Sequence, residues 1–191
     1  MNTRKVFGVA TNDSKDAVSH VVNGKQVFCN FYTTWKDMLR RCYDKKYQAS
    51  KPTYIGCIVC EEWMIFSNFK KWMESQDWQG KQLDKDLLKT GNKIYSPDFC
   101  VFISPDVNMF VSGSNELKAG KLIGYTKDGR RSSYVARCRN PITKLTESLG
   151  CYSDEVSAHN AWRVRKNELA NMLADLESDH RIAAALRLRY E

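Results

Sequence analysis

Three short alternating segments, followed by a long helical segment, constrain the fold of this chain more than any other feature. The segments IGYTK, SYVARCR and KLTESLGCY are separated by DGRRS and NPIT, which contain turn-forming residues. This alternation predicts three antiparallel strands joined as a meander. Ser153 is the expected cap of the helix that follows, with Asp154 and Glu155 in its first turn.

The long helix is expected to pack against this sheet through one apolar face. His159, beside Trp162, is expected to be a packed core histidine rather than a ligand. Arg163, Arg165 and Lys166 are expected on a solvated face of the helix. The residues that we assign to the apolar face are Val156, His159, Trp162, Val164, Leu169, Met172, Leu173 and Leu176.

The middle strand of the meander carries two arginines that share a face. Arg137 and Arg139 point the same way because side chains alternate with a period of two, while Ala136 and Cys138 point toward the helix. Residues 121–166 hold ten basic and four acidic residues, a net charge of +6. Such a face can bind bases or phosphates, although a solvated basic surface with no ligand is the alternative.

The composition of the whole chain agrees with a folded, basic protein. The 191 residues are 42% hydrophobic and carry a formal net charge of +8, which favours a polyanionic partner. No apolar run reaches the roughly 18 residues of a membrane span, and the first residues contain no apolar signal core. Seven scattered cysteines indicate reduced thiols, so we expect a cytoplasmic protein.

The N-terminal half combines helical and strand-like patterns. Apolar spacing predicts one helix from about residue 31 to Asp44 and a second from Glu61 to about Gln76. Residues 81–111 are expected to form a strand, a turn at Gly91-Asn92, a second strand and a short helix at Pro105. The expected organisation is an arm or small hairpin over 1–28, a central unit over 29–112, a linker over 113–121 and a C-terminal unit over 122–191.

The C-terminal motifs resemble the AP2 DNA-binding domain. They are Gly124-Tyr125, the segment YVARCR, the step LGCY and the helical segment AHNAW. The resemblance implies that the exposed sheet face enters the DNA major groove while the helix packs behind. The residues that it implies as DNA contacts are Arg137, Arg139, Lys127, Arg130, Arg131 and, more weakly, Lys144.

The motif order over residues 31–191 resembles phage HNH-like homing endonucleases that carry an AP2-like C-terminal module. Its central motifs are WKDMLRRCY, EWMIFSNF and LDKDLL, followed by the turn GN, then YSP. The resemblance implies an α+β protein whose central unit has a ββα-metal core with one divalent ion, Mg²⁺ or Mn²⁺. Its partner would be double-stranded DNA, and a phage-encoded protein would act in the host cytoplasm.

The same resemblance implies roles for five residues of the central unit. Asp84 and Asn108 match metal-ligand positions, and Asn92 matches the asparagine that orients the loop between the two strands. Lys85 occupies the position of the histidine base, and a protonated lysine cannot accept a proton. Lys85 could instead stabilise charge on the phosphate, with Asp86 as base, or the cleavage site is inactive. A solvated turn with paired charges is the alternative for these residues.

The sequence allows more than one interpretation of several other features. The pair Cys57 and Cys60 lacks the second ligand pair of a structural zinc site, so buried thiols are expected instead. A basic cluster at 40–46 suits either the end of a helix or DNA phosphates. The protein is an active nuclease, or a nuclease-inactive DNA-binding regulator, or a phage factor that binds a host protein. RNA binding through the same sheet is a further option, and the oligomeric state is not predicted.

Overall fold

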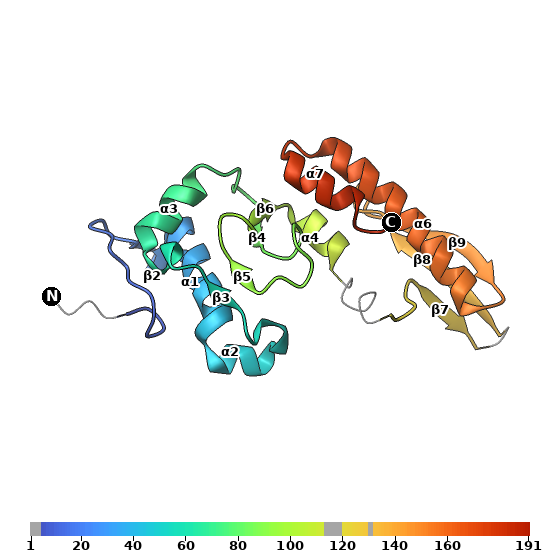
Figure 1. Cartoon of the computed structure of the whole chain (residues 1–191), viewed down its shortest axis with the longest axis horizontal. Coiled ribbons are helices and arrows are strands. Elements are labelled where there is room, and N and C mark those ends of the chain that lie inside the picture. The colour runs from blue at the N-terminus through green and yellow to red at the C-terminus, as the bar shows by residue number, and fades with distance from the viewer. Residues whose placement is uncertain (1–4, 113–119, 130–131) are drawn as a thin grey trace. The chain divides into compact units, whose positions relative to one another are not determined.

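The chain forms two compact units, Met1–Phe102 and Ile103–Glu191. The structure, a computed structural model, describes residues 5–112, 120–129 and 132–191. Helices and strands are mixed in both units, which confirms the α+β class (Figure 1). Among the described residues, no helix combines the length and the apolar character needed to cross a membrane. The predicted linker over 113–121 lies almost entirely outside the described residues.

Two helices build the core of the first unit. Helix α1 spans Asn30–Tyr43, as predicted, and α3 spans Phe66–Glu74. The second predicted helix is interrupted at its start, because Glu62–Met64 form a separate 3-10 turn before α3 begins. Trp35 of α1 is fully buried, and its Nε1 donates a 2.7 Å hydrogen bond to the carbonyl of Trp63. The aromatic stripes of both segments are therefore core, as expected.

A short helix and a 3-10 turn follow α1. Helix α2 spans Lys45–Ser50 and is capped by Asp44, whose side chain accepts hydrogen bonds from two backbone N–H groups. The 3-10 turn covers Pro52–Tyr54.

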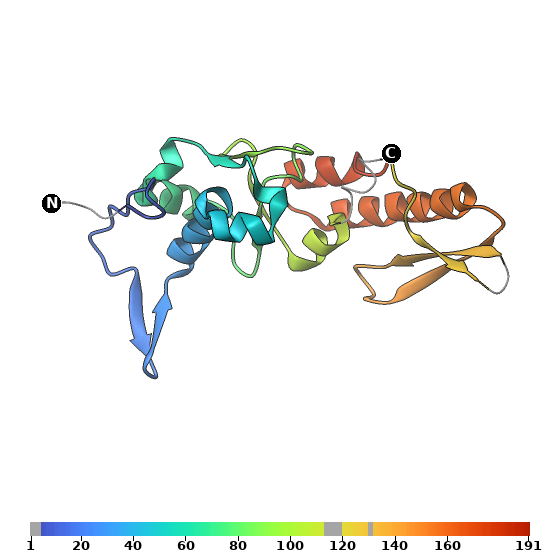
Figure 2. The same cartoon turned by 90° about the horizontal axis from the view of Figure 1, so that it is seen from below.

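The N-terminal arm contains a two-stranded hairpin. Strand β1 (Ser19–Val22) pairs with β2 (Lys25–Phe28) around Asn23 and Gly24, both of which have a positive φ. Most hairpin residues are exposed, and Figure 2 shows this blue hairpin projecting from its unit. Of the two alternatives for this segment, an arm or a small hairpin, the structure has a hairpin over residues 19–28.

The strands of the central region pair differently from our prediction. We expected residues around 83–88 to pair with the strand that begins near Ile94, across the Gly91-Asn92 turn. Instead β5 (Ile94–Tyr95) pairs in parallel with β3 (Ile58–Val59), and β4 (Gln82–Asp84) pairs with β6 (Val101–Ile103). The prediction was wrong because it paired two segments that are neighbours in sequence. In the structure, β5 lies along the chain between β4 and its partner β6, and β5 pairs with β3 instead.

The second unit contains the predicted meander. Strands β7 (Tyr125–Asp128), β8 (Ser133–Arg139) and β9 (Thr146–Tyr152) form one antiparallel sheet in the order β7-β8-β9. The pairing of β8 with β9 shifts by one residue between Ala136 and Arg137. Helix α4 (Pro105–Val111), which follows β6, also belongs to this unit, and Ser104 caps it.

One helix covers one face of this sheet, and a second helix packs against the first. Helix α6 (Glu155–Leu176) packs on β8 and β9, and α7 (His180–Arg187) packs against α6 (Figure 1). The cap of α6 is Asp154 rather than Ser153, since the Asp154 side chain accepts from the Ser157 N–H at 2.8 Å.

The buried face of α6 differs from the predicted one. Val156, Val164, Met172 and Leu176 are exposed, so assigning them to the apolar face was wrong. Alanines and one lysine are buried instead, because the buried residues of α6 lie on the side of the helix that is close to the sheet. The buried residues of α6 are Ala158, His159, Trp162, Lys166, Leu169, Ala170, Leu173 and Ala174.

Candidate functional site

The outer face of the sheet presents the two predicted arginines. Arg137 and Arg139 are exposed, whereas Ala136 and Cys138, between and beside them, are buried against α6. This arrangement confirms the predicted division of β8 into two faces. Successive side chains on one face of a strand lie about 7 Å apart. The two guanidinium groups therefore form a short basic row on the solvent side.

Small hydroxyl residues stand opposite the arginines on the neighbouring strand. Ser148 pairs with Arg137 and Thr146 pairs with Arg139, and both are exposed. Directly opposed residues of an antiparallel pair share a face. Neither arginine has an acidic partner among the residues that the structure describes. This outer face, formed by Arg137, Arg139, Thr146 and Ser148, is called the sheet face below.

The nearest carboxylate of β9 belongs to the other side of the sheet. Glu147 pairs with Cys138, which is buried toward α6. Its carboxylate accepts from Arg165 Nε at 2.7 Å and from Asn140 Nδ2 at 2.7 Å. The hydrogen bonds from Arg165 and then Asn140 lower the pKa of Glu147 to about 2. Its negative charge is thus neutralised by Arg165, and the sheet face keeps its positive charge.

The other predicted DNA contacts occupy different places. Lys127 pairs with Tyr134 rather than with an arginine, and its Nζ lies 5.7 Å from the centre of that ring, on the side of the sheet that Ala136 shares. Lys144 lies in the turn between β8 and β9, where its ammonium forms a 2.5 Å ion pair with Asp106 of α4. Arg130 and Arg131 lie outside the described residues.

Gly124 and Trp162 allow the start of β7 to lie close to α6. Gly124 has a φ of +88°, and a Cβ atom at this position would overlap the indole ring of Trp162. Trp162 stacks on His159, whose Nδ1 lies 3.0 Å from the carbonyl oxygen of Ile123. The interpretation of His159 as a packed core histidine is confirmed, and Gly124 is the residue that lets the strand approach so closely.

A buried lysine lies behind the sheet. Lys166, which we expected on a solvated face, is only 9% exposed. Its Nζ donates to the carbonyl oxygen of Phe110 at 2.7 Å and lies 3.7 Å from the centre of the Phe110 ring. The rings of Tyr190 and Trp162 surround it at 5.2 and 5.7 Å. Burial lowers the pKa of Lys166 to about 8.

The sequence contained one signal for this position. Lys166 follows Trp162 by four residues and precedes Leu169 and Ala170 by three and four, so it lies on the same helix face as these three buried residues. A lysine at such a position is normally assigned to solvent, because burying an ammonium group without a carboxylate is costly.

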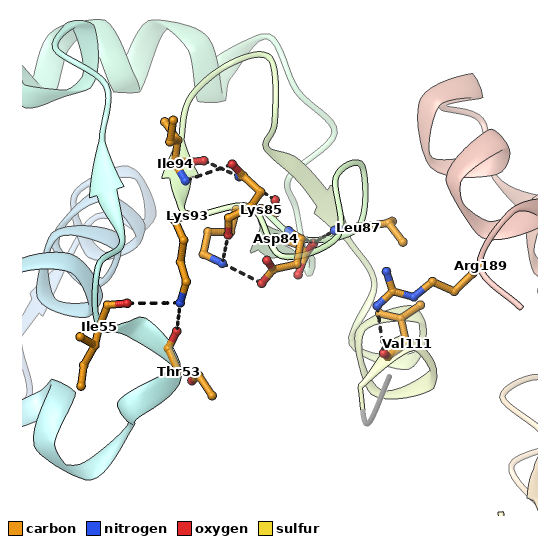
Figure 3. A network of polar contacts seen from close by, with 11 residues as sticks. Thr53, Ile55, Asp84, Lys85, Leu87, Lys93, Ile94, Val111 and Arg189 are labelled. Carbon is orange, nitrogen blue, oxygen red and sulfur yellow. Dashed lines mark hydrogen bonds and ion pairs between the residues drawn. The ribbon is translucent and has the colours of Figure 1, made fainter. Parts of the chain in front are cut away.

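In the first unit, the predicted catalytic residues form a closed loop after β4 (Figure 3). Lys85 is 5% exposed, and its Nζ donates 2.8 Å hydrogen bonds to Asp86 Oδ2 and to the carbonyl oxygen of Asn92. Asn92 Nδ2 donates in return to the carbonyl oxygens of Lys85 and Ile94, at 2.9 and 2.6 Å. Lys85 and Asn92 therefore fasten the two ends of the loop to each other, and neither is a solvated turn residue.

Asp84 anchors the start of the same loop. Its Oδ1 accepts from the backbone N–H groups of Asp86 at 2.8 Å and Leu87 at 2.6 Å. Burial raises the pKa of Asp84, against the opposing effect of these two hydrogen bonds. One oxygen of this carboxylate is thus already used within the loop.

The residues of this loop are a poor fit to a magnesium site. Lys85 occupies one oxygen of Asp86, and backbone groups occupy one oxygen of Asp84. Mg²⁺ takes six oxygen ligands, and several of these are usually water molecules. Asn108, the other predicted ligand, lies on α4 in the second unit. Within the described ranges, no group of three His, Cys, Asp or Glu side chains is placed to hold a metal ion.

Besides Cys29, four cysteines of the first unit lie in or beside its core. Cys42, Cys57 and Cys100 are buried, and Cys60 is half-buried. Burial raises the pKa of all four thiols, in the case of Cys42 to about 12. They are therefore protonated at neutral pH.

The chain was compared with protein-family models, with curated proteins and with solved structures, and none of them matches it.

Proposed function

We propose that this protein binds double-stranded DNA through the sheet face. The observation that carries the proposal is the exposed pair Arg137 and Arg139, flanked by two hydroxyl side chains and free of acidic partners among the described residues. An arginine can donate a fork of hydrogen bonds to guanine O6 and N7, or bind a phosphate. Serine and threonine hydroxyls complement both kinds of contact.

The shape of the second unit supports this mode of binding. A narrow β-sheet can enter the major groove, which is about 12 Å wide. Helix α6 covers the other face of the sheet, so the arginines are the side chains offered to a ligand. In this proposal the unit is AP2-like, and the strand–loop–strand–helix order of β4, β6 and α4 is HNH-like.

We further propose that the HNH-like region does not cleave DNA. Lys85 occupies the position of the general base, and its ammonium group donates two hydrogen bonds inside the loop. Such a group neither accepts a proton from water nor turns toward a ligand. The protein would then be a nuclease-inactive relative of phage HNH endonucleases that acts as a DNA-binding regulator in the host cytoplasm.

Replacing both arginines tests the binding proposal. The double variant Arg137→Ala/Arg139→Ala is expected to bind a DNA duplex at least about 10-fold more weakly, because each well-placed arginine contributes about 1–3 kcal/mol. Fluorescence anisotropy at several salt concentrations is the measurement, and the salt dependence should become shallower. The control is Arg163→Ala/Arg187→Ala, which removes the same charge from α6 and α7. Equal losses in the two variants would show that only net charge matters.

Active cleavage is the second candidate function, favoured by the presence of Asp84 and Asn92 around the loop after β4. The expected result of a plasmid-nicking assay with Mg²⁺ or Mn²⁺ is no metal-dependent nicking. Nicking by the wild type that is lost in Asp84→Ala would reverse this conclusion and make the protein an endonuclease.

A further inference from the structure

We propose that the first unit carries a second surface for the DNA backbone, at the corner where α1 meets α2. This inference rests on the proposed DNA binding and adds a contact region that the sheet face does not include. The basic residues of this α1–α2 corner are Arg40, Arg41, Lys45, Lys46 and Lys51.

Positive charge predominates at the corner, although Arg40 is paired with Asp37 of α1. Residues 40–54 contain five basic residues and one acidic residue, Asp44. The carboxylate of Asp44 is engaged at the start of α2, where its Oδ1 accepts from two backbone N–H groups at 2.9 and 3.2 Å. Lys45, Lys46 and Lys51 are exposed and have no carboxylate partner within the described part of the chain.

Tyrosine rings lie against both arginines of the corner, and Arg41 is also hydrogen-bonded to the buried Tyr95. The Arg40 guanidinium lies 4.7 Å from the centre of the Tyr47 ring, and that of Arg41 lies 5.6 Å from the Tyr54 ring. The two rings are 5.9 Å apart, so they form one support for both cations. Pre-ordered cations lose less conformational entropy when they bind a ligand.

A favourable interaction with the end of a helix does not explain all the basic residues of the α1–α2 corner. Arg40 and Arg41 lie in the last turn of α1, where positive charge is favourable. Lys45 and Lys46 instead occupy the first turn of α2, where positive charge opposes the helix dipole. The helix dipole therefore does not explain these two lysines, which favours an external anionic ligand as the reason for the cluster.

A hollow along α1 extends the corner. It has a volume of about 320 Å³ and is lined by Arg41, Thr33 and Thr34 of α1 and by Lys81 and Gln82. Asp37 also lines it and pairs with Arg40 at 3.1 Å. Hydroxyl, amide and cationic groups of this kind are the usual partners of phosphate oxygens. The ligand that fits a run of such groups beside exposed lysines is a phosphodiester backbone.

Removing charge from the two exposed lysines tests the inference. Lys45→Gln/Lys46→Gln is expected to weaken duplex binding about 10-fold at moderate salt and to reduce the slope of log K against log salt by about 2, since each lost phosphate contact removes about 0.9. The matched control is Lys25→Gln/Lys71→Gln, two exposed lysines on β2 and α3 of the same unit, which should bind as the wild type does. Thermal melting followed by circular dichroism checks that both variants are folded, and Lys51→Gln provides a second corner variant outside α2.

The outcomes separate this inference from the proposed function. Unchanged affinity and slope in Lys45→Gln/Lys46→Gln and Lys51→Gln, with a loss in Arg137→Ala/Arg139→Ala, would overturn the corner and leave the sheet face in place. A loss in the corner variants alone would overturn the sheet face and support the corner. Weaker binding of an RNA hairpin with unchanged binding of the DNA duplex would also overturn the inference, because the ligand would then be RNA.

Discussion

Gly124→Ala is expected to lower the free energy of unfolding of the second unit by at least about 3 kcal/mol. Two unfavourable effects, a steric overlap and a strained backbone, combine at position 124. The new Cβ atom would overlap the indole ring of Trp162, and the φ of +88° is one that residues with a side chain rarely adopt. Trp162 cannot withdraw easily, because it is buried and stacked on His159.

Gly120→Ala is the matched control for this experiment. Gly120 has a similar φ of +71°, but a Cβ atom there would meet nothing within 4 Å. Urea unfolding followed by circular dichroism gives the free energies, and hydrogen exchange of amides in β8 assigns the transition to the second unit. Similar losses in both variants would mean that backbone conformation alone is responsible and that the approach to Trp162 contributes nothing.

Lys166→Met is expected to stabilise the second unit by about 3 kcal/mol at pH 7. The pKa of Lys166 is lowered from 10.5 to about 8 by burial, and each pKa unit corresponds to about 1.4 kcal/mol. Methionine is similar in length and carries no charge. The carbonyl oxygen of Phe110 would keep one partner after the change, because Tyr190 Oη also donates to it at 3.0 Å.

The destabilisation by the buried Lys166 ammonium group depends on pH. A lysine with a lowered folded pKa binds fewer protons in the folded state than in the unfolded state between about pH 8 and 10.5. Wild-type stability therefore rises through that interval, and the penalty of the buried charge is present in full below it. The difference between wild type and Lys166→Met should shrink from about 3 kcal/mol at pH 7 toward zero near pH 10.5.

Urea unfolding at a series of pH values measures this difference, with Arg163→Met as the control for an exposed cation on the same helix. Other groups that titrate in this range are common to both proteins and cancel in the comparison. A variant that is less stable than the wild type at pH 7 would show that the aromatic rings and the Phe110 carbonyl compensate the ammonium group fully.

The sequence predicted those elements whose patterns are local. The three strands of the meander follow from alternation between turn residues, and α1 follows from apolar spacing. The two faces of β8 were predictable for the same reason, since the positions of Arg137 and Arg139 depend only on a period of two.

Long-range pairing and close packing were not predictable in this way. The pairing of β4 with β6 depends on a loop that Lys85 and Asn92 hold closed, and no local pattern encodes that closure. The buried face of α6 was misassigned because alanines such as Ala170 carry little hydrophobic signal, although they allow the helix to approach its neighbours closely. A lysine is not expected among the apolar residues of a buried helix face, so Lys166 was assigned to solvent.

The anchoring of α4 has a consequence for how the protein is made. Its last carbonyl groups, those of Phe110 and Val111, accept hydrogen bonds from Lys166, Arg189 and Tyr190 (Figure 3 shows the Arg189 contact). The ribosome adds Lys166 56 residues after Phe110, and Tyr190 only 80 residues after it, so these hydrogen bonds form late in synthesis. Among the described residues, the strands of the first unit pair only with strands up to β6, so this unit can fold before the partners of α4 have been synthesised.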